Sequence, residues 1–89
     1  MAELREHRLK RLHMRSIRRG IKEMDLILTK FSEMRLATLS DEELDLYEAL
    51  LAENDQDLYV WVSGQDQAPE QFRQMIADIY DNHVGHGQV

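Results

Sequence analysis

The sequence predicts an all-α fold, a small five-helix bundle. Apolar residues recur at alternating steps of three and four along most of the chain, which is the spacing of one face of a helix. No stretch alternates apolar and polar residues for long, so strands are not indicated. Ser40 and Glu43 form an S-x-x-E capping box, a helix-start signal. The 89 residues suffice for one domain.

The first two helices are expected in the N-terminal third of the chain. The first spans about Leu4 to Arg18 and turns Leu9, Leu12 and Ile17 inward. The second starts near Ile21, and its apolar face and flanks comprise Met24, Ile27, Leu28, Phe31 and Met34. Both helices are too short to be stable alone in water, so they need each other's apolar faces.

The third and fourth helices carry the clearest boundary signals. The capping box at Ser40 opens the third helix, whose buried stripe is Leu44, Tyr47, Leu50 and Leu51. Asn54 or Asp55 can cap a short fourth helix, and Gly64 suits its end.

The fifth helix is expected to begin at Pro69, a residue that favours the first helical position. Its predicted core residues are Phe72, Met75, Ile76, Ile79 and Tyr80. The single helical-bundle domain then covers residues 1–82, and residues 83–89 form a flexible C-terminal tail.

Composition excludes several classes of protein. Cysteine is absent, which removes disulfides, thiolate metal sites and cysteine nucleophiles. No apolar run approaches the roughly 18 residues of a membrane span. The N-terminus lacks a secretory signal, and Glu3 and Glu6 argue against a mitochondrial transit peptide, because such peptides are poor in acids. A cytosolic protein without membrane insertion is therefore expected.

Residues for metal binding or catalysis are not grouped in recognisable patterns. His83 and His86 have an H-x-x-H spacing, but no other ligand lies near them in the sequence, and no metal site is expected. The serines have no nucleophile signature, and no glycine-rich phosphate loop is present. The chain is not expected to be an enzyme, and no catalytic residue is assigned.

Basic residues are concentrated at the N-terminus. Residues 1–22 carry eight Lys/Arg and two acids, a net charge of +6, whereas the remainder carries −12. Five arginines of the first helix step by threes and fours, Arg19 follows directly, and the six form a cationic stripe: Arg5, Arg8, Arg11, Arg15, Arg18 and Arg19. The stripe has three interpretations: a solvated face paired with the protein's own acids, a protein-binding surface, or a nucleic-acid contact. The acidic body disfavours nucleic acid.

Two further features have both a structural and a functional interpretation. Trp61 and Tyr59 fit the core of a small bundle better than a binding surface, although either remains open. Gly20 ends the first helix, or it lets another backbone come close, because it has no side chain. Arg19 and Glu23, four residues apart, would flank that opening.

Arg19, Gly20 and Glu23 spell R-G-x-x-E within "RRGIKEMDLIL", which resembles the hallmark of the succinate dehydrogenase assembly factor 2 family, called SdhE in bacteria. The resemblance continues through "LSDEELDLYEALLAENDQDLYVWVSG" to the last helix and covers nearly the whole chain. One departure is Asp55, Gln56, Asp57, where the family commonly has Asp-Pro-Asp.

The resemblance implies a five-helix assembly factor that binds the flavoprotein subunit of succinate dehydrogenase, or of the related fumarate reductase. It would promote covalent attachment of FAD to a histidine of that subunit, acting as a monomer that holds no cofactor stably itself. Gly20 would permit close approach, Arg19 and Glu23 would make polar contacts, and Arg18 and Asp25 would support them. The neighbouring cationic helix, including Arg11 and Arg15, would steer the protein toward an acidic partner.

Two other functions remain as alternatives. One is a nucleic-acid-binding helical module that uses the arginine stripe, and the other is an antitoxin-type regulator, a label that members of the family have carried. Because the chain also lacks the long N-terminal extension of mitochondrial members, the resemblance implies a bacterial, cytoplasmic protein.

Overall fold

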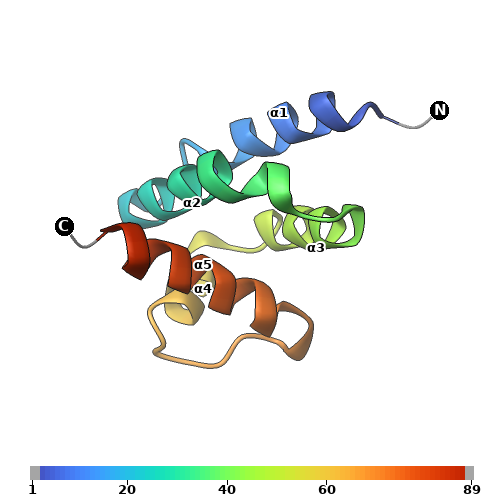
Figure 1. The fold of residues 1–89 in the computed structure, drawn as a ribbon. Coiled ribbons are helices and arrows are strands. Elements are labelled where there is room, and N and C mark those ends of the chain that lie inside the picture. The colour runs from blue at the N-terminus through green and yellow to red at the C-terminus, as the bar shows by residue number, and fades with distance from the viewer. Residues whose placement is uncertain (1–2, 88–89) are drawn as a thin grey trace.

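The computed structural model describes residues 3–87, and Figure 1 shows its helices stacked around one core. Within these residues the chain contains no strand, and the expected all-α fold with five helices is confirmed. In chain order the elements are α1 (Arg5–Ser16), α2 (Lys22–Arg35), the 3₁₀ turn η1 (Leu36–Thr38), α3 (Asp41–Leu51), α4 (Asp55–Val62), the 3₁₀ turn η2 (Glu70–Phe72) and α5 (Arg73–Gly87).

In Figure 1, α1 lies at one end of the stack and α4 and α5 at the other, with α2 and α3 between them. α2 packs against α1, α4 and α5, so it is the central helix of the fold. α3 packs against α1 on one side and α5 on the other. Every helix thus buries its apolar stripe against at least two others, which compensates for their short length.

The core forms one continuous cluster built from all five helices. Phe31 and Tyr47 lie at its centre with their rings 5.5 Å apart, and both are fully buried. Other fully or almost fully buried members are Leu12, Met24, Leu28, Leu44, Leu50, Leu58, Phe72, Met75 and Ile79. The apolar stripes predicted for these helices are largely confirmed.

A buried polar pair ties α1 to α3. The hydroxyls of Ser16 and Tyr47 lie 2.6 Å apart, and that of Ser16 also donates to the Leu12 carbonyl. Burial raises the pKa of Tyr47 to about 12, because a phenolate would lose its hydration in this site. Ser16 ends α1 at this contact, two residues before the predicted end.

Helix boundaries follow the local signals in most places. Ser40 accepts from the backbone N–H of Glu43, whose side chain accepts in turn from the Ser40 N–H, so the capping box is confirmed. Asn54 caps α4 by accepting from Gln56. Gly64 follows α4 with φ +81°, a left-handed conformation that favours glycine.

The C-terminal part differs from the prediction in three respects. Pro69 precedes the η2 turn, and α5 begins only at Arg73. Tyr80 is 47% exposed instead of buried, because Ile79 and Ile76 occupy the face toward the core and Tyr80 lies at its edge. α5 continues to Gly87 and so includes residues 83–87 of the predicted tail, whereas residues 88–89 lie outside the described part.

Candidate functional site

The segment between α1 and α2, residues 17–21, holds the R-G motif in an irregular conformation. Arg18 has φ +58°, the left-handed region that costs a non-glycine residue of order 1 kcal/mol. Its backbone N–H donates to Asp25 Oδ1 at 3.0 Å, across the first turn of α2. The break therefore falls before Gly20, and Arg18 rather than Gly20 makes the left-handed turn. The Arg18 side chain is exposed and has no bonding partner among residues 3–87.

Arg19 points into the molecule, and its side chain is only 12% exposed. Its guanidinium donates to Asp55 Oδ1 at 2.7 Å, to the Arg15 carbonyl at 3.0 Å and to the Leu51 carbonyl at 3.1 Å. Leu51 is the last residue of α3, where carbonyls lack a partner within the helix. One side chain thereby joins the ends of α1 and α3 to the start of α4.

Gly20 is exposed, and its N–H donates to Asp55 Oδ2 at 2.6 Å. A Cβ built on Gly20 would lie 3.1 Å from that same oxygen, closer than ordinary van der Waals contact. Its φ lies outside the left-handed region, unlike that of Gly64. A side chain at position 20 would therefore require the Asp55 carboxylate to shift, whereas the turn itself does not require glycine.

Glu23 is the motif residue that stays available. It is exposed in the first turn of α2 and forms no hydrogen bond or ion pair within residues 3–87. It lies at the rim of an open groove of about 360 Å³ between α2, α4 and α5. Exposed Leu26 and Tyr80 line this groove, together with Ile27, Tyr59, Val62 and Val84. An unpaired carboxylate beside exposed apolar side chains is suited to a protein partner.

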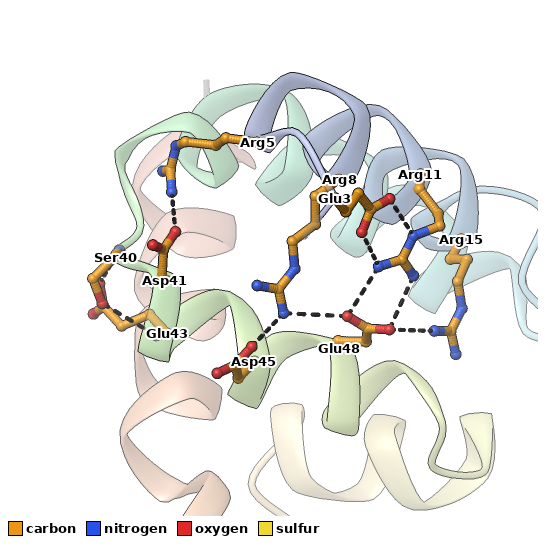
Figure 2. A network of polar contacts seen from close by, with 10 residues as sticks. All are labelled: Glu3, Arg5, Arg8, Arg11, Arg15, Ser40, Asp41, Glu43, Asp45 and Glu48. Carbon is orange, nitrogen blue, oxygen red and sulfur yellow. Dashed lines mark hydrogen bonds and ion pairs between the residues drawn. The ribbon is translucent and has the colours of Figure 1, made fainter. Parts of the chain in front are cut away.

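Figure 2 shows that the cationic stripe of α1 faces acidic side chains of α3. Arg5 pairs with Asp41, and Arg8 pairs with Asp45 and Glu48. Arg11 bonds Glu3 and Glu48, each at 2.9 Å, and Arg15 lies 3.9 Å from Glu48. Of the three interpretations of the stripe, pairing with the protein's own acids is therefore confirmed for these four arginines.

The pairing perturbs the charged groups in the expected directions. The hydrogen bonds from Arg11 hold the pKa of Glu48 below its usual value, against the opposing effect of burial. Hydrogen bonds to Glu3 and then to Glu48 raise the pKa of Arg11. The network is half exposed, so solvent and salt screen these pairs and each of them contributes little to stability.

A first prediction concerns Glu48→Gln and acid stability. Because the folded-state pKa of Glu48 lies below the unfolded value of 4.5, its contribution is fully present above that pH and is lost as pH falls through the folded-state pKa. We expect the variant to lose about 1 kcal/mol near pH 7 and to approach the wild type near pH 3. Thermal unfolding against pH measures this, and Glu42→Gln, an exposed acid of the same helix, is the control. An equal loss at both pH values would contradict the assignment.

The structure thus brings together five of the seven predicted site residues and separates two. Arg18, Arg19, Gly20, Glu23 and Asp25 lie around one bend, whereas Arg11 and Arg15 face α3. Asp55 and the groove at Leu26 were not predicted as parts of the site. The available signal for Asp55 was its place in the D-x-D-L-Y stretch of the family resemblance.

The other candidate residues of the sequence, the aromatic pair of α4 and the histidines, mostly make contacts within the fold. Trp61 is half-buried with its ring 6.1 Å from that of Phe72, and Tyr59 is half-buried at the groove. His13 shares a 2.6 Å hydrogen bond with Ser32. Within residues 3–87, no group of three or more His, Asp or Glu is arranged to hold a metal ion. None of the helices in this part of the chain has the length and apolar character needed to cross a bilayer.

Residues 10–83 match a family model described as flavinator of succinate dehydrogenase. Among curated proteins, the chain is 46% identical over 61 residues to succinate dehydrogenase assembly factor 2, mitochondrial, of Meyerozyma guilliermondii, covering 68% of this chain and 45% of that protein. It is 33% identical over 85 residues to assembly factor 2-B, mitochondrial, of Drosophila mojavensis, covering 93% and 54%. A bacterial protein, FAD assembly factor SdhE of Legionella pneumophila, is 32% identical over 62 residues, covering 70% and 78%.

The chain thus spans about half the length of the two mitochondrial relatives. Their names overturn the expectation of a bacterial, cytoplasmic protein, since this chain is similar to mitochondrial assembly factors of eukaryotes. The expectation relied in part on Glu3 and Glu6 as evidence against a transit peptide. Arg5–Ser16 form α1, and Glu3 pairs with Arg11, so this acidic and basic composition serves the fold and says nothing about targeting.

Proposed function

Because this chain belongs to the family of flavinators of succinate dehydrogenase, we propose that it binds the flavoprotein subunit of that enzyme and promotes covalent attachment of FAD to a histidine there. The flavoprotein of the related fumarate reductase is a second candidate partner. The match over residues 10–83, which includes the whole R-G-x-x-E bend, is the observation that carries the proposal. The chain acts as a monomer that holds no cofactor of its own.

The proposed mechanism is conformational. The family is one of assembly factors, and the flavin supplies the bond-forming chemistry. A binding protein can favour attachment only if it binds the attachment-competent conformation of the subunit more tightly than other conformations. Holding the flavin and the acceptor histidine in reacting geometry would then lower the entropic part of the barrier.

The proposed contact surface is centred on the bend before α2. Glu23 and the Arg18 side chain are exposed and unpaired within residues 3–87, and Gly20, between them in the sequence, is exposed as well. Asp25 supports the bend by accepting a hydrogen bond from the Arg18 backbone N–H. The groove at Leu26 and Tyr80 extends the surface with apolar area. Arg15 and Arg11 lie further along α1 and face α3, where Glu48 pairs with both and Glu3 pairs with Arg11, so they flank this surface with little free charge.

The test is covalent flavin on the flavoprotein subunit, measured as fluorescence on a denaturing gel from cells that contain or lack this gene. We expect the band to fade without the gene, to return with the wild type, and to stay at least tenfold weaker with Glu23→Ala. The matched control is Glu33→Ala, an exposed glutamate of the same helix that is roughly 15 Å along its axis. An unchanged band without the gene would refute the function, and full activity of Glu23→Ala would refute the site.

The alternative functions receive no support from the comparisons. A nucleic-acid contact would need free cations on α1, but Arg5, Arg8, Arg11 and Arg15 are paired with acids of the same chain. No observation favours an antitoxin role.

A further inference from the structure

We propose that Asp55, in the first turn of α4, is a positioning residue that holds the Arg19–Gly20 segment in the conformation presented to the flavoprotein subunit. This inference rests on the proposed function, because it names a residue that supports the proposed contact surface. Asp55 lies 36 positions from Arg19 in the sequence and is not part of the R-G-x-x-E motif.

The carboxylate of Asp55 bonds two successive residues through its two oxygens. Oδ1 accepts from the Arg19 guanidinium at 2.7 Å, and Oδ2 accepts from the Gly20 N–H at 2.6 Å. The first contact holds a side chain and the second holds the backbone, so together they restrict both the position and the direction of the segment. Asp55 is itself held by α4, whose positive N-terminal end favours a carboxylate in its first turn.

The other bonds of the segment hold the Arg19 side chain, which also donates to the carbonyls of Arg15 and Leu51, and leave its backbone with few attachments. α1 ends at Ser16 and is followed by Ile17 in an extended conformation, and α2 begins after Ile21 with no side-chain cap. Apart from Asp55, the side chain that bonds its backbone is Asp25, at Arg18. Without Asp55, residues 19 and 20 would sample more conformations, and ordering them would oppose binding of the partner.

The same geometry changes the explanation of Gly20. A methyl group there would meet Asp55 Oδ2 at 3.1 Å before it meets any partner. A substitution at Gly20 therefore acts first by displacing the Asp55 carboxylate. Gly20→Ala and Asp55→Ala therefore disturb the same contact, and their effects on binding will not add.

The experiment is a double-mutant cycle on affinity for the isolated flavoprotein subunit, measured at a temperature where circular dichroism shows every variant folded. We expect Asp55→Ala to weaken binding on the order of tenfold, Gly20→Ala to weaken it by less, and the double variant to bind no more weakly than Asp55→Ala. Asp57→Ala, an exposed acid in the same turn of α4, should bind as the wild type does. In NMR, hydrogen exchange of the Gly20 amide should be faster in Asp55→Ala than in the wild type, and unchanged in Asp57→Ala.

Wild-type affinity in Asp55→Ala would overturn the inference, as would fully additive losses or a Gly20 amide that exchanges at an unchanged rate. A wild-type protein that does not bind the subunit would instead overturn the proposed function. The exchange measurement needs no partner, so the two failures are distinguishable.

Discussion

Gly20→Arg is expected to abolish covalent flavin attachment to the partner while leaving the protein helical. The new Cβ would press on Asp55 Oδ2 at 3.1 Å, and the added guanidinium would compete with Arg19 for the same carboxylate. Gly20 lies outside every helix and outside the left-handed region, so the helices themselves should persist. The bend would be distorted and covered by a long side chain at the point where the partner is proposed to dock.

Flavin fluorescence on a denaturing gel and a pull-down with the flavoprotein subunit measure this loss, and circular dichroism measures the helix content. Gly85→Arg is the matched control, because a Cβ there has no neighbouring atom within 4 Å. Full flavin attachment by Gly20→Arg would mean that the bend is not the docking site. A loss of helical signal would mean that the substitution acts by unfolding.

Arg19→Ala should lower the stability of the fold more than Gly20→Arg does, although the sequence predicted that Arg19 contacts the partner. The change leaves Asp55 without its cation and removes donors from the carbonyls of Arg15 and Leu51. Because the pair is mostly buried, at 12% and 20% exposure, the expected cost is about 2–3 kcal/mol. For a domain of this size the midpoint of thermal unfolding should fall by roughly 10–20 °C.

Arg18→Ala is the control for this prediction, since it removes an arginine of the same bend. The Arg18 side chain has no bonding partner within residues 3–87, and its N–H can still donate to Asp25. We expect its unfolding midpoint to stay within a few degrees of the wild type. Equal shifts in both variants would show that Arg19 contributes charge to the bend and no specific bonds.

Features of the fold that depend on neighbouring residues could be predicted from the sequence, and others could not. The apolar stripes of α2 and α3 could be predicted, because helical periodicity repeats every few residues and reflects burial directly. The capping box at Ser40 and the left-handed Gly64 are likewise local signals with a local cause. The prediction that Tyr80 is buried was wrong. Periodicity indicates which face of a helix points to the core, but not how much of that face the neighbouring helices cover.

The candidate site, in contrast, depends on contacts between residues that lie far apart in the sequence. R-G-x-x-E marks the bend in the sequence, yet Ser16, the last residue of α1, makes its side-chain contact with Tyr47, 31 positions away. The cationic stripe could be seen in the sequence, but its pairing with acids of α3 could not, because those acids lie 33 to 40 positions further along.

The sequence by itself therefore determined the helices, most of their ends and the family, since these depend on neighbouring residues and on a long continuous match. Only the tertiary structure decided which charged groups are already paired. Arg19 turns inward to Asp55, whereas Glu23 remains exposed beside the groove at Leu26. The physical reason is that a hydrogen bond acts over about 3 Å in space, and the packing of helices brings distant parts of the chain to that distance.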